Sequence, residues 1–172
     1  TLSSSSAASD VYKRQVPGRT GCSIPVSVVE RLSRHPNIAG IKEASGDMSY
    51  AMKIARCVGP DFALYSGNDD ITVPLMSVGG SGVISVYANV MPAMCHQIVA
   101  DFLGGNQAQA VANHLKYLQL MNDLFLEVNP IPVKTAMNLL GLNVGPMRLP
   151  LCEMSEEHAA ALRRTMEEAG LL

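Results

Sequence analysis

Residues 40–47, with the sequence GIKEASGD, lead a short apolar run directly into a lysine. The longer run NIAGIKEA lies between Pro36 and Ser45-Gly46, so it predicts a strand that carries Lys42 near its end. Partial burial lowers the pKa of an amine, and the neutral amine is a nucleophile toward carbonyl carbon atoms. Lys42 is therefore a candidate covalent catalyst. The alternative interpretation is a strand-end lysine whose ammonium group reaches water.

Two further apolar runs follow, FALYS from residue 62 and GVISV from residue 82, and helical patterns separate the three runs. All three runs are apolar throughout rather than alternating, which is typical of parallel strands buried on both faces and built from βα units. Helical spacing is clear before the first strand (residues 24–36), after it (47–59) and after the second (70–80). Asp47 is the expected N-cap of the second of these helices.

The pattern changes after Met91, where only helices are predicted, at about residues 91–103, 106–126, 131–141 and 155–170. The last of them has Ser155 as its expected N-cap. We therefore expect partial (β/α) barrel units over residues 16–104 and a helical domain over 105–172. Residues 1–15 are rich in serine and alanine before they become charged, and nothing in residues 1–9 would pack in a core, which predicts a foreign or disordered lead.

The composition excludes some classes of partner. The chain has 172 residues, 48% of them apolar, and a net charge of −2 with acidic and basic residues mixed, so no basic patch for nucleic acid is expected. Its four cysteines form no CxxC pair and no histidine stands at metal-ligand spacing, which predicts buried free thiols in a reducing compartment and no metal. No apolar run approaches the roughly 18 residues of a membrane helix.

Three other motifs carry candidate binding residues. In YSGNDD (65–70), Gly67 follows a strand and would allow a substrate to approach the backbone, although the same residues would also suit a turn that caps the next helix. In VPGRTG (16–21), Arg19 suits carboxylate binding or is simply a solvated loop arginine. In NPIPVK (129–134), Lys134 lies early in a helix and is a weaker nucleophile candidate than Lys42.

The GGSG segment (79–82) contains glycines like those of a phosphate-binding loop, but it follows a helix and precedes a strand. In an α/β fold this order places it at the edge of the sheet opposite to the substrate face. We therefore interpret it as a helix stop and a turn.

The motifs VPGRTG, GIKEASGD, YSGNDD, GGSGVISVYANV and NPIPVK, in this order and spacing, resemble the C-terminal part of the pyruvate-dependent class I aldolase family that includes dihydrodipicolinate synthase and N-acetylneuraminate lyase. The resemblance covers residues 16–172. It implies strands 6–8 of a (β/α)8 barrel, followed by a helical domain. It also implies a cytoplasmic lyase of lysine and diaminopimelate biosynthesis that works without metal or organic cofactor and forms a homo-oligomer when full-length.

The resemblance assigns roles to four residues. Lys42 corresponds to the lysine that forms a Schiff base with pyruvate, whose enamine attacks aspartate semialdehyde to give 4-hydroxy-tetrahydrodipicolinate. Arg19 corresponds to the residue that binds the carboxylate of the aldehyde, and the VPxRT form favours the synthase branch. Gly67 and Ile84 correspond to residues that line the pyruvate pocket.

The chain departs from the family pattern just before Val16. The synthase pattern has tyrosine and asparagine there, and this chain has Arg14 and Gln15. The family tyrosine relays protons, which arginine cannot do because it stays charged at neutral pH. The upstream half of a barrel is also without counterpart, so we expect a fragment with little or no activity alone. A sister aldolase or dehydratase acting on another 2-oxo acid, and a non-catalytic α/β module, are the alternatives.

Overall fold

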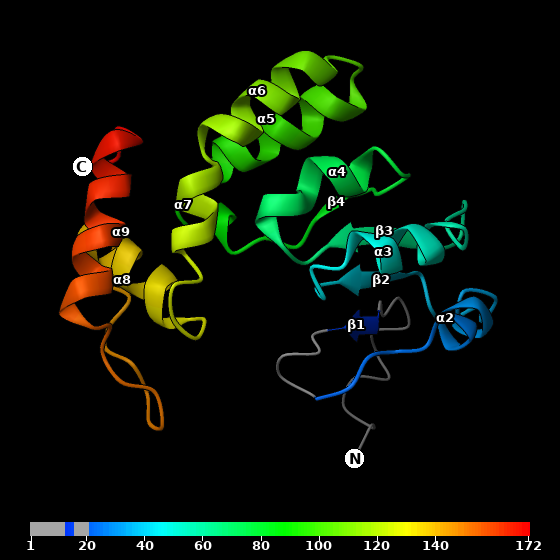
Figure 1. Ribbon diagram of the computed structural model, residues 1–172, viewed down its shortest axis with the longest axis horizontal. Coiled ribbons are helices and arrows are strands. Elements are labelled where there is room, and N and C mark those ends of the chain that lie inside the picture. Colours follow the sequence, from blue (N-terminus) through cyan, green and yellow to red (C-terminus); the bar gives the residue numbers. More distant parts are fainter. Residues whose placement is uncertain (1–12, 16–20) are drawn as a thin grey trace. The chain divides into compact units, whose positions relative to one another are not determined.

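The computed structural model describes residues 13–15 and 21–172, and the chain divides into two compact units, the first ending at Ile84 and the second beginning at Ser85 (Figure 1). The sequence placed this division at residues 104 and 105. It lies earlier because helix α5 (Pro92–Leu103) packs on α6 (Gln107–Lys116) and on the 3-10 helix η3 (Tyr87–Asn89). An amphipathic helix belongs to whichever unit covers its apolar face.

The first unit is built on a parallel sheet whose strand order follows the order of the chain, as Figure 1 shows for its longer strands. The four strands are β1 (Lys13–Gln15), β2 (Gly40–Glu43), β3 (Ala63–Ser66) and β4 (Gly82–Val83). The connections contain α2 (Val26–Leu32), α3 (Met48–Ala55), the 3-10 helix η2 (Asp69–Ile71) and α4 (Thr72–Met76). The predicted parallel βα arrangement is thus found.

The three described α-helices of this unit cover the same face of the sheet. Ile41 and Leu64 are register partners on β2 and β3, so they point to the same face. Both belong to one buried cluster with residues of all three α-helices, namely Val29, Ala51, Ile54 and Leu75. A doubly wound sheet would place helices on both faces, whereas a barrel places all of them outside. The described sheet therefore has the winding of a barrel segment.

Two strands differ from the sequence-based prediction. Lys13–Gln15 pair in parallel with β2 although they lie in the segment predicted as a lead, because three residues are too few to show an apolar period. The twelve residues before them lie outside the described part of the chain. Strand β4 has only two residues, whereas GVISV predicted five. Gly79 and Gly82 of the preceding GGSG segment have positive φ values of 102° and 145°, as suits the predicted turn.

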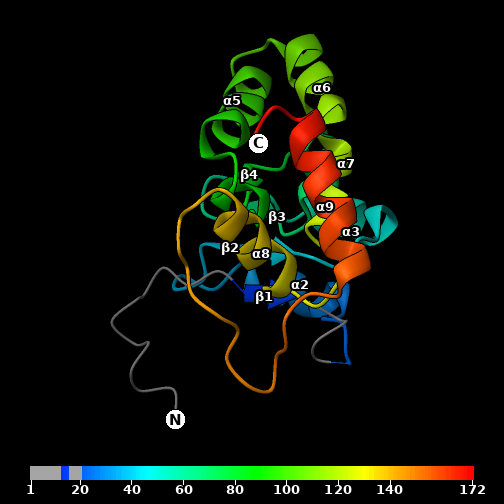
Figure 2. The same cartoon turned by 90° about the vertical axis from the view of Figure 1, so that its left-hand side faces the viewer.

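The second unit is helical, as predicted. Between residues 85 and 172 it contains α5, α6, α7 (Leu118–Asp123), α8 (Ile131–Leu139) and α9 (Glu156–Glu168). The single helix predicted for 106–126 is divided at Tyr117, whose φ of −103° and ψ of 9° are not helical. Figure 2 shows α5 beside α6, and α9 beside α7 and α8, and each of these pairs makes contact. Buried Leu162 and Met166 of α9 provide its apolar face.

Several sequence-based expectations concern the whole described chain. No helix within residues 13–15 and 21–172 is long and apolar enough to cross a membrane. The same residues contain no group of three or more His, Cys, Asp or Glu that could hold a metal ion. None of the four cysteines, all of which lie in the described residues, forms a disulfide; only Cys95 is buried, while Cys22 and Cys152 are exposed. The prediction of buried thiols was therefore wrong for these two, which lie in irregular segments rather than on packed helix faces.

Candidate active site

Lys42 lies at the carboxyl end of β2, and only 7% of its surface is exposed. Its register partners are Tyr65 on β3 and, further across, Gly82 on β4. Because side chains alternate along a strand, these residues belong to the face opposite to Ile41 and Leu64. The lysine is thus buried on the sheet face that the helices of its own unit leave uncovered, and it does not extend along the surface into water.

Gly67, one residue after β3, packs directly against Lys42. A Cβ atom at this position would lie 2.7 Å from Cε of Lys42 and would also collide with the Cβ of Ala44. The Gly67 N–H donates to the main-chain oxygen of Glu43 at 2.6 Å. The absence of a side chain at Gly67 thus leaves room for the side chain of Lys42, and the approach of a substrate to this glycine stays a prediction.

The other three positions singled out near the site differ in what the structure describes. Ile84 follows β4, and its N–H donates to the main-chain oxygen of Ser66 at 2.8 Å, so it lies beside the residue that precedes Gly67. Arg19 lies outside the described residues. Arg14 is the register partner of Lys42 on the other side of β2, so the departure from the family pattern falls on the strand position adjacent to the lysine.

Four other buried polar residues lie at the same edge of the sheet as Lys42, and none of them was predicted from the sequence as a site residue. They are Glu43, Ser66, Asp69 and Thr72. The Ser66 hydroxyl donates to the main-chain oxygen of Asn68 at 2.7 Å, and the Thr72 hydroxyl donates to the same oxygen at 3.4 Å. These bonds order the loop after β3. Alternation along a strand is the sequence signal that could have separated the residues on the face of Lys42 from those on the opposite face.

Glu43 is fully buried and follows Lys42 directly, on the opposite face of the strand. Its Oε1 accepts the Ser45 N–H at 2.5 Å. Burial raises the pKa of this carboxyl above the ordinary value, with a further rise from the charge of Asp47, and the bonds from Ser45 act in the other direction. The charged form of Glu43 is therefore disfavoured although it has a donor.

Lys134, the weaker nucleophile candidate, is at the start of α8 in the second unit. Its Nζ donates to the main-chain oxygen of Pro146 at 2.5 Å. That bond ties the segment after α8 to the helix. The arrangement gives Lys134 a structural contact within the second unit.

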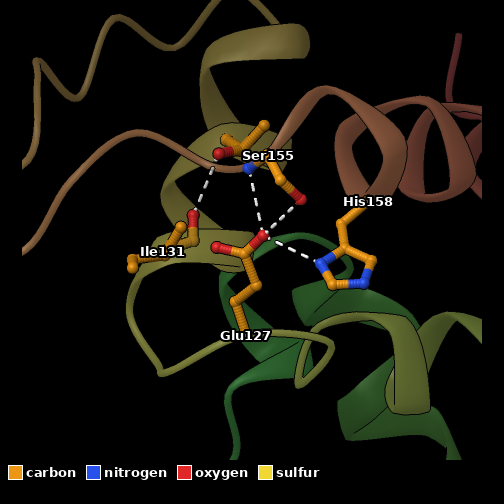
Figure 3. Close-up of polar contacts among 5 residues, drawn as sticks. Glu127, Ile131, Ser155 and His158 are labelled. Atoms are coloured by element: carbon orange, nitrogen blue, oxygen red, sulfur yellow. Dashed lines mark hydrogen bonds and ion pairs between the residues drawn. The ribbon is translucent and has the colours of Figure 1, made fainter.

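Figure 3 shows a second polar cluster, formed by Glu127, Ser155 and His158 in the second unit. Oε1 of Glu127 accepts from the Ser155 N–H at 3.0 Å and from its hydroxyl at 2.7 Å, and it lies 2.8 Å from Nδ1 of His158. The three side-chain types are those of a hydrolytic triad, but the hydroxyl bonds to the carboxylate and not to the imidazole. A serine nucleophile needs the imidazole as its base, so this arrangement is structural.

The same cluster changes the expectation for Ser155. The residue is the N-cap of α9 as predicted, yet its side chain makes no capping bond within the helix. Its hydroxyl donates to Glu127 instead. The bonds from Ser155 and then from His158 lower the pKa of Glu127, which favours a carboxylate at this positive end of the helix.

Comparison with known proteins gives one consistent family. The model of the dihydrodipicolinate synthetase family matches residues 9–169, so the match begins before Val16. The 4-hydroxy-tetrahydrodipicolinate synthase of Clostridium perfringens is 47% identical over 157 residues, which are 91% of this chain and 54% of that protein. The enzyme of the same name from Caldicellulosiruptor saccharolyticus is 49% identical over 91% of this chain and 52% of its own length. The chain thus spans about half the length of these relatives.

Solved structures agree with this finding. Dihydrodipicolinate synthase from Thermotoga maritima matches with a TM-score of 0.91 and 39% identity, over 95% of this chain and 57% of its own. The synthase from Cyanidioschyzon merolae, crystallised with lysine bound, matches with a TM-score of 0.90 and 41% identity, over 98% of this chain and 58% of its own. Sequence and backbone therefore point to the same group of proteins.

Proposed function

The chain belongs to the dihydrodipicolinate synthetase family, and from this we propose that it carries the nucleophile for condensing pyruvate with aspartate semialdehyde to 4-hydroxy-tetrahydrodipicolinate. Lys42 is the nucleophile, with no metal or organic cofactor. The single observation that carries the proposal is that Lys42 is buried at the carboxyl end of a parallel strand and packs against Gly67, which directly follows the next strand. Substrates of barrel enzymes bind at this edge of the sheet.

The chemistry follows from an amine held in a dry site. Nζ of Lys42 attacks the ketone carbon of pyruvate, and loss of water gives an imine. Loss of a proton from the pyruvate methyl group then gives an enamine, whose terminal carbon forms a bond to the aldehyde carbon of aspartate semialdehyde. The amino group of that substrate displaces Lys42 from the imine carbon, which closes the ring and frees the enzyme.

We assign the binding roles to three further residues. Arg19 binds the carboxylate of the aldehyde substrate through its guanidinium group, a geometry suited to two parallel hydrogen bonds. Gly67 and Ile84 line the pyruvate pocket beside Lys42, and the main-chain bond of Ile84 to Ser66 supports this assignment. In the same proposal β2, β3 and β4 correspond to strands 6–8 of a (β/α)8 barrel, and the longer protein is a homo-oligomer.

The test is reductive trapping of the imine. The chain is incubated with pyruvate and borohydride, digested, and its peptides are weighed by mass spectrometry. We expect a reduced pyruvyl adduct on Lys42 that Lys42→Ala abolishes and Lys134→Ala leaves unchanged. An adduct that is absent on the folded chain, or that forms on Lys134, would contradict the assignment.

Turnover by the 172-residue chain alone is expected to be very low. Relatives about twice as long carry the reaction's name, and a barrel of about 250 residues encloses its substrate on all sides. A coupled synthase assay on the chain alone, and on a chimera with the upstream half of the Clostridium perfringens relative, measures this difference. Full turnover by the chain alone would overturn the expectation.

A non-catalytic role is the second candidate, and one observation favours it. Strand β1 places Arg14, and not a tyrosine, at the position in register with Lys42. Restoring the family residue with Arg14→Tyr in the chimera separates the two candidates. An active-site role predicts faster imine formation in the variant, whereas a non-catalytic module predicts no imine with either residue.

A further inference from the structure

The buried carboxyl of Glu43 has no role in the reaction proposed above, although it directly follows Lys42. It is fully buried, and strand alternation sends it to the opposite face from the lysine. A buried ionisable group is costly unless it is bonded, and a structure retains it where those bonds matter. The Glu43 carboxyl accepts the N–H of Ser45, which lies in the loop that follows β2.

That loop is anchored at both ends. The Glu43 side chain accepts the Ser45 N–H at 2.5 Å, and the Ser45 hydroxyl accepts the Asp47 N–H at 3.1 Å. Asp47 in turn accepts the Tyr50 N–H at 3.0 Å and so caps α3. A continuous series of hydrogen bonds therefore runs from the end of the lysine strand to the first turn of the next helix.

The same loop and the lysine side chain both pack against Gly67. Ala44 stands between Glu43 and Ser45, and its Cβ, together with Cε of Lys42, occupies the space beside Gly67. The main-chain oxygen of Glu43 holds the Gly67 N–H at 2.6 Å. The main-chain oxygen of Glu43 thus holds Gly67. Its side chain holds Ser45, the residue after Ala44.

We propose that Glu43 is a positioning residue for Lys42, whose side chain holds residues 44–46 in place so that they keep the lysine in its buried position against Gly67. The proposal rests on the proposed function for the chemical role of the lysine. The positioning itself concerns only the contacts of Glu43 and can be measured without any reaction.

Glutamine is the informative substitute for Glu43. An amide oxygen can accept the same Ser45 N–H, and burial already favours the uncharged acid. Glu43→Ala removes the acceptor, and Glu43→Asp keeps a carboxyl that is one methylene too short to make the same bond. Asp61→Ala is the matched control, because it removes an exposed acid of the same unit at the amino end of β3.

The experiment compares the reactivity of Lys42 with that of Lys53, an exposed lysine on α3, in the same molecules. Each folded variant is labelled with a trace of acetic anhydride, and the Lys42 to Lys53 ratio is read by mass spectrometry. We expect the ratio to rise about tenfold in Glu43→Ala, because the Ser45 N–H loses its buried acceptor. In Glu43→Gln the ratio should stay near the value of the unsubstituted chain. Asp61→Ala should not change it.

The same variants are then trapped with pyruvate and borohydride. Adduct formation on Lys42 should slow about tenfold in Glu43→Ala and be rescued in Glu43→Gln. If Glu43→Ala does not fold, Glu43→Asp takes its place, with the same direction expected. An unchanged labelling ratio in these variants would overturn the proposal, and so would Glu43→Gln behaving like Glu43→Ala. A changed ratio with no pyruvate adduct in any form would support the positioning role and reject the proposed reaction.

Discussion

Each unit of the molecule contains a glutamate that accepts the main-chain N–H of a serine, and the two glutamates are perturbed in opposite directions. Glu43 at the sheet edge has its pKa raised, because burial is the largest influence on it. Glu127 beside α9 has its pKa lowered, because it is held by the hydroxyl and N–H of Ser155 and by His158. The same side chain and the same kind of donor thus lead to opposite charge preferences.

The difference shows that the bonds from Ser45 do not offset the loss of water around the buried Glu43 carboxylate. Three donors do so at Glu127, where solvent also remains close. In the helical unit the donors around Glu127 favour its charged form, whereas in the sheet unit burial disfavours the charged form of Glu43. The following predictions test how far this contrast holds.

The largest effect is expected where the sheet edge is packed most tightly. Gly67→Ala places a Cβ 2.7 Å from Cε of Lys42, and Ala44 is also in its way. We expect a loss of about 1–3 kcal/mol in the free energy of unfolding from overpacking, together with a fall of at least about tenfold in pyruvate trapping at Lys42. Urea unfolding and borohydride trapping measure the two effects.

Gly59→Ala is the matched control for this substitution. A Cβ at Gly59 meets no atom within 4 Å, and its φ is not in the positive range. The control should leave both stability and trapping close to the unsubstituted values. Equal losses in the two alanine variants would show that packing against Lys42 is not the cause.

The contrast between the glutamates predicts opposite pH profiles. A raised folded-state pKa means that the Glu43 contribution to stability is present below about pH 4.3 and is lost as the pH rises through the folded value. Glu43→Gln should therefore gain stability relative to the unsubstituted chain as the pH rises from 4 to 7. Unfolding free energies at several pH values in this window measure the gain.

Glu127 should show the reverse sign in the same series. Its lowered pKa means that its contribution is present above about pH 4.3 and is lost as the pH falls through the folded value. Glu127→Gln should therefore be less stable than the unsubstituted chain at neutral pH and approach it at acid pH. If the stabilities of Glu43→Gln and Glu127→Gln, each relative to the unsubstituted chain, changed with pH in the same direction, the contrast between the two glutamates would be wrong.

The smallest effect is expected at the helix caps. Asp47 accepts the Tyr50 N–H at the start of α3, so Asp47→Ala should cost about 1 kcal/mol of unfolding free energy. Ser155 makes no side-chain bond of this kind, and its N–H stays bonded to Glu127 after substitution, so Ser155→Ala should cost less. Thermal unfolding of the two variants side by side decides between them.

Long apolar periods predicted most of the described fold, whereas short elements were not predictable. The strand around Lys42 and the helix capped by Asp47 were found where expected, because apolar runs and caps act within a few residues. Strand β1 was missed, since its three residues become a strand only by pairing with β2. The break at Tyr117 was missed for a similar reason, because the flanking helices α6 and α7 continue the same composition.

The candidate site divides in the same way. Lys42 and Gly67 were chosen from motifs, and the structure brings them into contact. Glu43 was passed over because a single sequence does not show that the residue behind a lysine is buried to the same extent. Arg19 stays a prediction, since it lies outside the described residues.

The sequential order of the sheet also shapes how the protein can form. Each of the strands β2, β3 and β4 pairs with the strand made just before it, so every pairing closes a loop of one helix and its connections. The entropy of loop closure grows slowly with length, and contacts that are near in sequence form early. A chain with this strand order can form its sheet while it is being synthesised, because each new strand pairs with a strand that has already been made.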